Sequence, residues 1–411
     1  MNFLDIFLGV LTAVGGFIDI SNLVFNTQAG AIFHYSLLWP IVIGAIGIAL
    51  YSEMAGRIAA VAKKPDFDLI RERMGFPLGM TTLIASLFIT IMTCAAEIGG
   101  IAIVLRLLSA LPYFFTILIA GLIILLVLWL LKFKWLERVF GFLGLFLLVL
   151  ILVAFNLHPN LKLVGEGFIP QIPSHLSPPH LFSYLYFVIG VISSIIMPYN
   201  VFFYSSGGIE EHWTAKDLLT NRVSTYVGYI FGSVLAVALT IIGAIIFHPL
   251  GIQPQLLNSV ALGSTIVFGK IGLIMVLLGI LFAVGGAAVE TSLAGAYSLS
   301  QFFGWHWGRY EKPSKTPFFT LTWIIIIVIA VLILFSGINP VSITQYAVIF
   351  SIVALPFTYI PIYLVSNDKF YMGKYVNGRI TNTLGIVYLI IIVICAVTAL
   401  PLFFLSQGGS T

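Results

Sequence analysis

Long apolar runs, separated by short polar connections, follow one another along the whole chain of 411 residues. A helix needs about 20 apolar residues to cross the roughly 30 Å hydrocarbon core of a bilayer. The runs are continuous and do not alternate polar with apolar positions, which excludes a transmembrane β-barrel. The pattern predicts an all-α polytopic membrane protein with a single integral domain over residues 1–411. Eleven spans are expected, near residues 7–30, 36–62, 77–107, 113–131, 136–157, 182–207, 222–248, 266–302, 318–336, 341–366 and 382–405.

Composition agrees with a membrane protein, because 60% of the residues are hydrophobic, 8% are charged and the mean hydropathy is +1.11. A soluble globular chain averages about 25% charged residues. The net charge of +4 forms no basic face, so nucleic acid is not an expected partner. Cys94 and Cys395 fall in distant spans, which argues against a structural disulfide. The first run carries Asp5 and lacks a basic leader, so we expect it to be retained as a span.

The distribution of Lys and Arg predicts the orientation in the membrane. With the N-terminus in the cytoplasm, only Arg106, Lys162 and Lys270 of the 19 basic residues lie on the outer side, which leaves 16 for the cytoplasmic side. Cytoplasmic loops are enriched in Lys and Arg. Eleven spans then place the C-terminus outside. The compact loops favour a bacterial inner or plasma membrane.

The first span contains an interruption at Asp19-Ile-Ser-Asn22. A charge at the centre of a membrane helix costs roughly 2.5–3.5 kcal/mol on insertion scales, so such a residue indicates a functional site. Asp, Ser and Asn side chains also offer the backbone local hydrogen bonds that compete with a helix. Asp19 alone could instead pair with an Arg or Lys elsewhere.

The sixth span contains a second interruption, in which Met197 and Asn200 flank Pro198. Proline removes an intrahelical hydrogen bond and clashes with the preceding turn. Taken alone, Pro198 is typical of a plain kink and Met197 of packing. Five spans separate the starts of the two interrupted helices, so two five-span halves would have opposite orientations. Interrupted spans at matching positions of two halves indicate the binding site of a transporter.

The residues at these interruptions suit a divalent cation. Asp19 offers a charged oxygen, Asn22 an amide oxygen and Met197 a polarizable sulfur, while unwound turns free backbone carbonyls. Oxygen ligands alone suit Mg²⁺ or Ca²⁺, and a thioether shifts selectivity towards Mn²⁺, Fe²⁺ or Cd²⁺. The chain shows no Cys/His spacing of a zinc site, and a single carboxylate suits transient binding better than a structural site.

Here the chain resembles the Nramp family of divalent-metal transporters, as a divergent, Nramp-related prokaryotic member. The resemblance spans nearly the whole chain. It is carried by DISN (19–22), TQAGAIFHYSLLW (27–39), AAEIGG (95–100), MPYN (197–200), ETSLAG (290–295) and LPFTYIPIYLVSNDKFYMGKYVNG (355–378). It implies a LeuT-like fold of two inverted five-helix repeats, 1–157 and 182–366, followed by an extra helix, 382–405.

The resemblance also implies a metal site and shows where this chain departs from the family. Asp19, Asn22 and Met197 would bind metal, helped by a carbonyl near Ser194. The departures are Ile20 and Ser21 for Pro and Gly, Tyr199 and Tyr204 for two histidines, Cys94 for an acid, and Val348 for a Gln, with Gln345 one turn earlier. The lost acid and histidines are the groups linked to proton movement in the family. We therefore expect weak or absent proton coupling, with uptake driven by the metal gradient and the membrane potential.

Other buried acids allow more than one interpretation. Glu97 belongs either to a remnant of a proton route or to a bond with a neighbouring helix. Glu290 is expected to satisfy a polar helix contact rather than to bind metal. Glu53 and Arg57 are four residues apart, so they can form an ion pair on one helix face, or belong to an inner gate.

These features predict a secondary transporter, not an enzyme, that imports Mn²⁺ or Fe²⁺ by alternating access. No cofactor is expected beyond the transported ion, and no obligate protein partner beyond the lipid bilayer. A Mg²⁺ transporter of the Nramp-related branch is the near alternative, because Ser21 and Ser194 could hold a partly hydrated ion. An Nramp-like membrane sensor, an organic-solute transporter and a channel remain as alternatives of other classes.

Overall fold

The computed structural model describes residues 19–131, 139–140, 142–173, 177–254 and 257–409. Within these residues, nine helices are long and apolar enough to cross a membrane, or ten if one bent pair is a single span. The long helices are α3 (Trp39–Ala62), α4 (Asp66–Ser109), α5 (Tyr113–Leu130), α9 (Pro178–Ile195), α10 (Pro198–Glu210), α11 (Leu218–Ile242), α12 (Leu257–Phe303), α13 (Pro317–Phe335), α14 (Pro340–Asn367) and α16 (Arg379–Leu405). In that count, α9 and α10 form one interrupted span.

The first expected span is described only in its second half, as helix α2 (Ile20–Phe33). The fifth expected span, 136–157, continues to Asn156 through α7 (Leu148–Asn156), but residues 136–138 lie outside the described part of the chain. Lys132, Lys134 and Arg138, three of the basic residues expected on the cytoplasmic side, lie outside it as well.

The connection between the fifth and sixth expected spans contains a short helix, α8 (Leu161–Gly167). The Asn160 side chain starts this helix by accepting hydrogen bonds from the backbone nitrogens of Lys162 (3.1 Å) and Leu163 (3.4 Å). The chain bends by 117° between the preceding span and α8. The sharp bend ends the span and directs the chain away from it.

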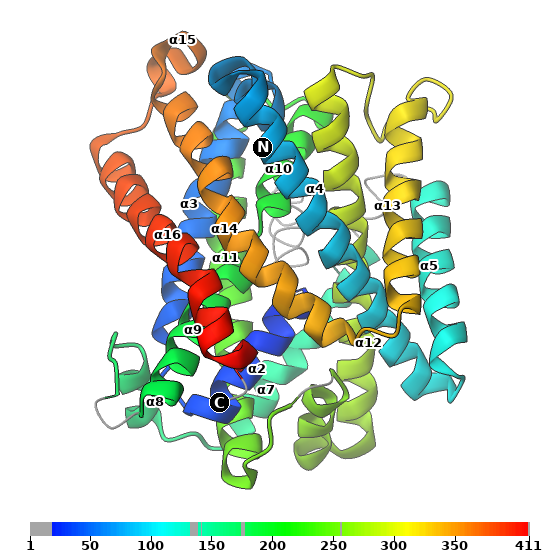
Figure 1. Ribbon diagram of the computed structural model, residues 1–411, viewed down its shortest axis with the longest axis vertical. Coiled ribbons are helices and arrows are strands. Elements are labelled where there is room, and N and C mark those ends of the chain that lie inside the picture. Colours follow the sequence, from blue (N-terminus) through cyan, green and yellow to red (C-terminus); the bar gives the residue numbers. More distant parts are fainter. Residues whose placement is uncertain (1–18, 132–138, 141, 174–176, 255–256, 410–411) are drawn as a thin grey trace.

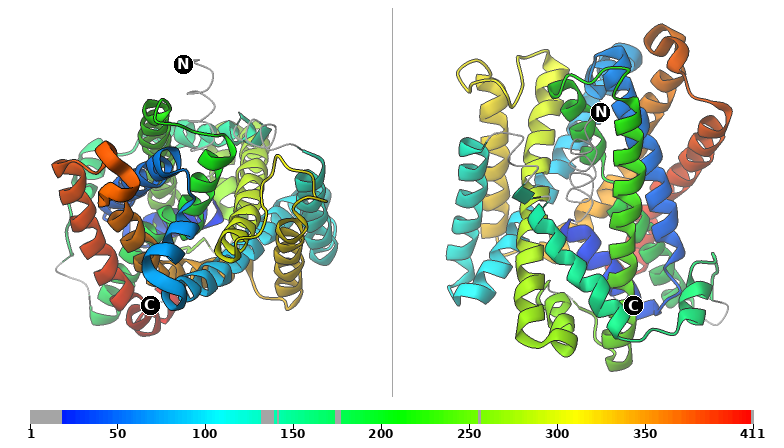
Figure 2. Two further views of the ribbon diagram at one scale, coloured as in Figure 1. Left: turned by 90° about the horizontal axis from the view of Figure 1, so that it is seen from above. Right: turned by 180° about the vertical axis from the view of Figure 1, so that it is seen from behind.

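The long helices run between two ends of the molecule (Figure 1). Helix α14 crosses in front of the others and packs on α4 and α16, while α5 and α13 form one edge. The two further views show α11 and α7 on the opposite side (Figure 2). The short α15 (Lys369–Met372) marks one end, and α8 marks the other. We call the end with α15 the basic end, because Lys64, Arg73 and Lys374 lie in or beside its loops.

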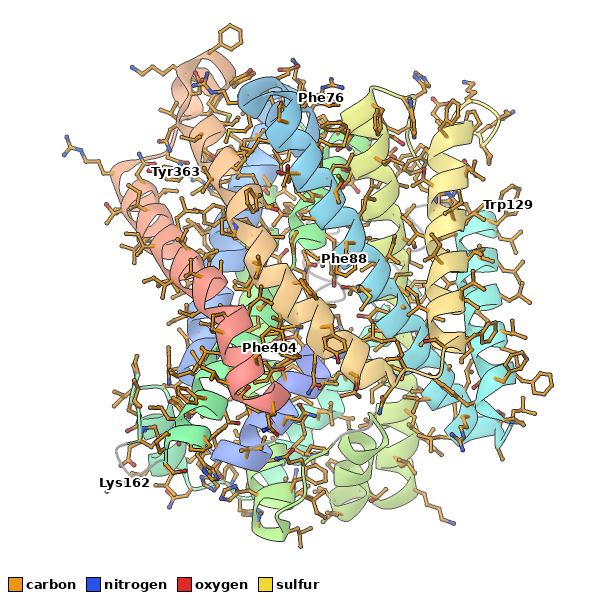
Figure 3. The ribbon with its side chains drawn as sticks, viewed as in Figure 1. Phe76, Phe88, Trp129, Lys162, Tyr363 and Phe404 are labelled. Atoms are coloured by element: carbon orange, nitrogen blue, oxygen red, sulfur yellow. The ribbon has the colours of Figure 1, made fainter. Side chains whose placement is uncertain are left out.

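The sides of the molecule are apolar where lipid would cover them. Trp129 is 57% exposed and Phe404 is 73% exposed, and both lie on the outer surface (Figure 3). Among the described residues, the buried interior forms one large apolar cluster and a smaller one around Phe67 and Phe302. Exposed apolar sides with a packed interior are the arrangement expected of a membrane-spanning bundle.

Two long helices are each broken, a few turns after they begin, by a glycine with positive φ. Gly75 in α4 has φ 77°, and Gly269 in α12 has φ 58°. Glycine adopts this region without steric cost. The expected third span began at residue 77. The polar helix 66–74 lies before the break at Gly75 and therefore precedes that span.

Helix α2 is held against the end of α11 by a close backbone approach. A Cβ atom at Gly30 would lie 2.0 Å from the carbonyl oxygen of Thr240, and one at Gly243 would lie 2.2 Å from that of Thr27. Small residues allow helix backbones to approach in this way in membrane proteins. The second half of the first span therefore has a fixed place beside the seventh.

Candidate metal-binding site

The polar site begins where α2 begins. Asp19 is the N-cap of α2, with an extended backbone (φ −107°, ψ 178°), and its Oδ1 accepts a hydrogen bond from the backbone nitrogen of Asn22 at 2.8 Å. Aspartate is a preferred N-cap residue because its side chain satisfies a free N–H of the first turn. The Ser21 hydroxyl also donates to Asp19 Oδ1. The charged residue is thus held at a helix start inside the membrane protein, with 1% of its surface exposed.

The second interruption lies directly against the first. Helix α9 ends at Ile195, Ile196 and Met197 are extended, and α10 starts with Pro198 in its first position. Proline is favoured at that position because its missing N–H would be unpaired in any case. The carbonyl oxygen of Ser194 accepts hydrogen bonds from Asn22 Nδ2 at 3.0 Å and from Ser21 Oγ at 3.3 Å. The expected neighbours, Asp19, Asn22 and the Ser194 carbonyl, therefore lie within one hydrogen-bonded cluster.

Two further side chains complete the cluster around Asp19. The Tyr199 hydroxyl donates to Asp19 Oδ2 at 3.1 Å. The backbone nitrogen of Ile20 donates to Glu97 Oε1 at 3.2 Å, so Glu97 bonds to the neighbouring helix. Its second oxygen, Oε2, is buried without a hydrogen-bond partner within the described residues. Glu97 thus holds the first turn of α2 and leaves one oxygen inside the site.

The site is enclosed and contains carboxyl groups. Asp19, Asn22, Glu97 and Met197 are each at most 2% exposed. Among the described residues, no Lys or Arg forms an ion pair with Asp19. A buried charge without a paired partner is costly, and a bound cation would supply the missing charge. The alternative that Asp19 pairs with a basic side chain finds no support there.

Other expected site residues take distinct places. Met197 is the N-cap of α10 and is fully buried, at the same break as the Ser194 carbonyl. Gln345 is half-buried on α14, while the Val348 carbonyl accepts a hydrogen bond from the Ser193 hydroxyl at 2.7 Å. This bond ties the tenth span to the end of α9.

Cys94 and Glu290 face the same interior from α4 and α12. Both cysteines of the chain are buried and free, as expected. Cys94 contacts the Thr291 side chain, the neighbour of Glu290. The polar helix contact expected for Glu290 is not found, because no hydrogen bond or ion pair of its carboxylate occurs within the described residues. Glu290 instead lies within electrostatic range of Asp19.

Tyr204 does not join the site. Its hydroxyl donates to Asn221 Oδ1 at 2.9 Å, towards the basic end of the molecule. The two tyrosines that replace the family's histidines are therefore separated, with Tyr199 at the metal-binding cluster and Tyr204 in a different polar network.

Sequence reasoning missed the direct bond between Tyr199 and Asp19. The sequence marked Tyr199 only as a departure from a histidine, and residues 19 and 199 are too far apart in the chain for spacing to relate them. The role of Ser21 was also only partly expected, because its hydroxyl bonds both Asp19 and the Ser194 carbonyl. The sequence did offer one indication of these roles, because Tyr199 and Ser21 each adjoin an interruption.

Comparison with known proteins identifies the family of this chain. Residues 9–401 match the family model described as Nramp, natural resistance-associated macrophage protein-like. The chain belongs to the Nramp family. Membership makes it a membrane transporter rather than an enzyme, with the LeuT-like fold that the motifs implied.

A relative agrees with this Nramp assignment, and two solved structures share the fold. The divalent metal cation transporter MntH of Staphylococcus aureus (strain Mu3) is 28% identical over 93% of this chain and 88% of its own length. The manganese transporter of Eremococcus coleocola, solved with an aromatic bis-isothiourea compound, has a TM-score of 0.75 at 23% identity, over 97% of this chain and 86% of that one. MhsT, solved with L-phenylalanine, has a TM-score of 0.65 at 16% identity, over 98% of both chains.

Proposed function

We propose that this Nramp protein imports divalent metal cations, with Mn²⁺ or Fe²⁺ favoured, by alternating access through the site at the two interruptions. One observation carries the proposal: the Asp19 carboxylate, the Asn22 amide and the Ser194 carbonyl converge in a buried cluster to which no basic side chain is bound within the described residues. The names of the relatives, a divalent metal cation transporter and a manganese transporter, agree with it.

The ligands would exchange hydrogen bonds for metal bonds. In this cluster the Asn22 side-chain nitrogen donates to the Ser194 carbonyl and to Asp19 Oδ1. A cation between these groups would take the two oxygens, and the Asn22 amide would present its oxygen instead. Met197 would add a sulfur from the second break. Hard oxygen ligands with one thioether favour Mn²⁺, Fe²⁺ or Cd²⁺ over Mg²⁺.

Mg²⁺ is the second candidate because a hydroxyl already lies in the cluster. Ser21 Oγ bonds both Asp19 and the Ser194 carbonyl, so it could hold a water of a partly hydrated ion. Mg²⁺ usually keeps several waters in protein sites. The Ser194 hydroxyl is less suited to this role, because it donates to the Val191 carbonyl at 2.9 Å.

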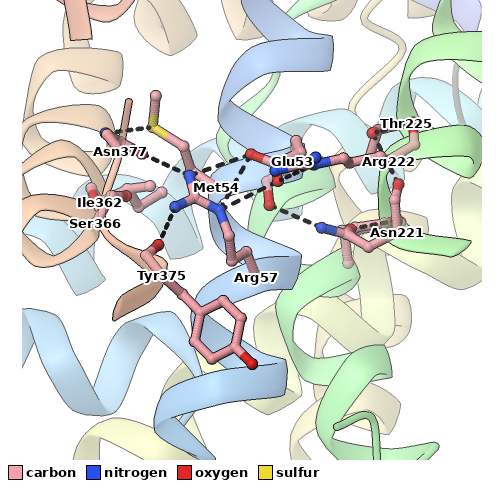
Figure 4. A network of polar contacts seen from close by, with 11 residues as sticks. Glu53, Met54, Arg57, Asn221, Arg222, Thr225, Ile362, Ser366, Tyr375 and Asn377 are labelled. Atoms are coloured by element: carbon pink, nitrogen blue, oxygen red, sulfur yellow. Dashed lines mark hydrogen bonds and ion pairs between the residues drawn. The ribbon is translucent and has the colours of Figure 1, made fainter. Parts of the chain in front are cut away.

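We propose that Glu53 and Arg57 belong to an inner gate at the basic end (Figure 4). The Arg57 guanidinium donates to Glu53 within α3 (3.1 Å) and to the Tyr375 carbonyl after α14 (2.6 Å). A second nitrogen donates to Asn377 Oδ1. Both charged side chains are buried, at 3% and 5% exposure. Arg57 thus joins the second span to the segment after the tenth.

The same network extends to the sixth and seventh spans. Asn221, near the start of α11, donates to the Glu53 carbonyl at 2.9 Å and accepts from Tyr204 of α10. Arg222 lies 3.6 Å from Glu53 Oε1. Because Met197 is the N-cap of α10, opening of this network would be coupled to the half-helix that leaves the metal site. We propose that the network closes the cytoplasmic side and opens for metal release.

We further propose the topology and the driving force. The basic end faces the cytoplasm of an inner or plasma membrane, the C-terminus lies outside, and the two inverted repeats are 1–157 and 182–366. The positive-inside distribution supports this orientation. Transport has weak or no proton coupling, since Cys94, Tyr199 and Tyr204 replace the groups linked to proton movement in relatives. Histidine is the side chain best suited to relay protons near neutral pH.

The test is uptake of Mn²⁺ and Mg²⁺ into proteoliposomes that contain a metal-sensitive dye. Asp19→Asn is the variant, because asparagine is also a good N-cap and removes only the charge. Asp368→Asn is the matched control, because Asp368 is likewise an N-cap and accepts from the Phe370 nitrogen at 2.9 Å. We expect Asp19→Asn to abolish Mn²⁺ uptake and Asp368→Asn to leave it within about twofold.

Other results of this uptake experiment would favour a different function. Strong Mg²⁺ uptake that depends on Asp19 would select the magnesium alternative. Met197→Leu, which removes only the thioether, is expected to weaken Cd²⁺ competition more than Mn²⁺ uptake. No uptake, or uptake that does not depend on Asp19, would overturn the proposal and favour a sensor or an organic-solute transporter.

A further inference from the structure

Two histidines from distant parts of the chain meet at the end of the molecule away from the basic end. His34 directly follows α2, and His248 follows the π-helical turn 243–247 that continues α11. Their ring centres are 5.3 Å apart, with an angle of 60° between the ring planes. Figure 1 shows α2 and α8 at this end, and α15 at the opposite one. The pair therefore lies outside the Asp19 cluster and outside the Arg57 network.

The spacing of the two rings suits a shared metal ion. Imidazole nitrogens bind Zn²⁺ at about 2.0–2.1 Å in a tetrahedral arrangement. Two rings on one such ion have their centres roughly 5 Å apart, because each centre lies about 1 Å behind its nitrogen. The observed 5.3 Å between His34 and His248 agrees with this value.

His248 is also oriented as a metal ligand would be. Its Nδ1 lies 2.9 Å from the carbonyl oxygen of Ala31. A carbonyl only accepts, so Nδ1 carries the proton and, in the neutral ring, Nε2 keeps a lone pair. Metal-binding histidines commonly donate their other ring N–H to a backbone carbonyl, which fixes the tautomer. His248 therefore presents the nitrogen that a metal requires.

The backbone conformation at His34 places its ring beside that of His248. His34 adopts a positive φ of 55° after the last turn of α2, and its ring lies 4.0 Å from that of Tyr35. No hydrogen bond of the His34 ring occurs within the described residues. Burial, and secondly the neighbouring His248, lower the pKa of His34, which favours its neutral form. A neutral imidazole is the form that binds metal.

The packing below the pair fixes the two histidines relative to each other. The backbones of α2 and the end of α11 approach closely at Gly30 and Gly243, where an added Cβ would lie 2.0 Å and 2.2 Å from a carbonyl oxygen of the facing segment. His34 lies four residues after Gly30, and His248 lies five after Gly243. Each histidine therefore extends from the same close helix contact, which pre-forms the site before an ion arrives.

We propose that His34 and His248 form a second divalent-metal site, outside the transport site, that binds borderline transition metals with water completing the coordination. Zn²⁺, Ni²⁺ and Co²⁺ are the ions that two neutral imidazoles favour, whereas Mg²⁺ and Mn²⁺ prefer oxygen. The site takes metal at the proposed outer face, and it does not depend on the ion that the Asp19 cluster carries.

Calorimetric titration of the purified full chain with Zn²⁺ tests this assignment. The Asp19→Asn protein serves as background, because it removes the charged ligand of the transport site. His34→Asn and His248→Gln are made in this background, since asparagine tolerates a positive φ. His158→Asn is the matched control, because His158 also has a positive φ of 51° and its Nδ1 lies 2.6 Å from the Asn156 carbonyl.

We expect one Zn²⁺ per chain in the Asp19→Asn background and in its His158→Asn derivative. His34→Asn and His248→Gln should each weaken this binding at least tenfold, with unchanged thermal unfolding to show that the fold is intact. Mg²⁺ should not compete. Zn²⁺ binding that persists in both histidine variants, or that is missing from the background protein, would overturn the proposal. Neither result depends on whether Asp19 carries metal, so the two proposals fail separately.

Discussion

At the scale of single residues, Tyr199 occupies one oxygen of the Asp19 carboxylate that a metal ion would bind. Its hydroxyl donates to Asp19 Oδ2 at 3.1 Å, while Ser21 and Asn22 occupy Oδ1. A hydrogen bond to a charged group contributes about 1.5–3 kcal/mol. Because a metal ion must compete with this bond, we predict that Tyr199→Phe lowers the Mn²⁺ concentration for half-maximal uptake by about tenfold or more. Concentration-dependent uptake into proteoliposomes measures this change.

Tyr186→Phe is the control for the Tyr199 substitution. Tyr186 is also fully buried, and its hydroxyl has no hydrogen-bond partner within the described residues. Its removal should leave Mn²⁺ uptake unchanged. Weaker Mn²⁺ binding in Tyr199→Phe would contradict the prediction and show that the hydroxyl orients the carboxylate or binds the ion itself.

The sequence predicted the charged centre of the site but not the bonds inside it. Asp19 and Asn22 could be recognised because a carboxylate and an amide within an apolar run have few structural explanations. The Tyr199 bond and the free Glu97 oxygen depend on side-chain directions across three helices, which no periodicity encodes. Glu290 shows the same limit, because a single acid in a span does not reveal whether a partner faces it.

At the scale of helices, the Arg57 network is a point where four elements are joined. Breaking a buried ion pair by removing one partner costs about 3–5 kcal/mol, because the remaining charge is unpaired. We predict that Arg57→Gln releases residues 373–378 from α3. The backbone N–H of Asn377, which donates to the Ser366 carbonyl at 3.1 Å, should then exchange with solvent at least fivefold faster. Hydrogen exchange followed by mass spectrometry measures this rate.

Arg73→Gln is the control for this loss of charge. Arg73 also bonds an acid at the basic end, Asp368 at 3.2 Å, but it is half exposed, and such pairs contribute little. Arg57→Lys should give an intermediate result, because lysine keeps the charge and loses the planar fork. Equal exchange in Arg57→Gln and the unaltered protein would show that the network is not a gate.

The helices themselves were largely predictable, and their breaks only partly. Apolar length gave most spans to within a few residues, since a bilayer sets that length. Pro198 predicted the second break, whereas the breaks at Gly75 and Gly269 were not expected, because glycine alone does not reveal a positive φ. These glycines lie near the starts of α4 and α12, the third and eighth spans. That correspondence supports the proposed inverted repeats.

At the scale of the whole molecule, the membrane potential acts on the charge that the site carries. Moving two charges inward across 100 mV is worth about 4.6 kcal/mol. Each 1.4 kcal/mol is a factor of ten, so uncoupled transport could sustain a Mn²⁺ ratio on the order of 10³. In the proposed orientation, the basic end would face the negative side.

We predict that Mn²⁺ uptake rises with an inside-negative potential and moves no protons. Potassium-loaded proteoliposomes with valinomycin set the potential, while separate dyes report internal Mn²⁺ and internal pH. Without a pH gradient, uptake should increase with the potential in the unaltered protein and vanish in Asp19→Asn. Because Cys94 and Tyr199 stand where the family resemblance implies an acid and a histidine, internal pH should stay constant during uptake. Acidification that follows Mn²⁺ and is lost in Asp19→Asn would show instead that Glu97 or Glu290 carries protons with the metal.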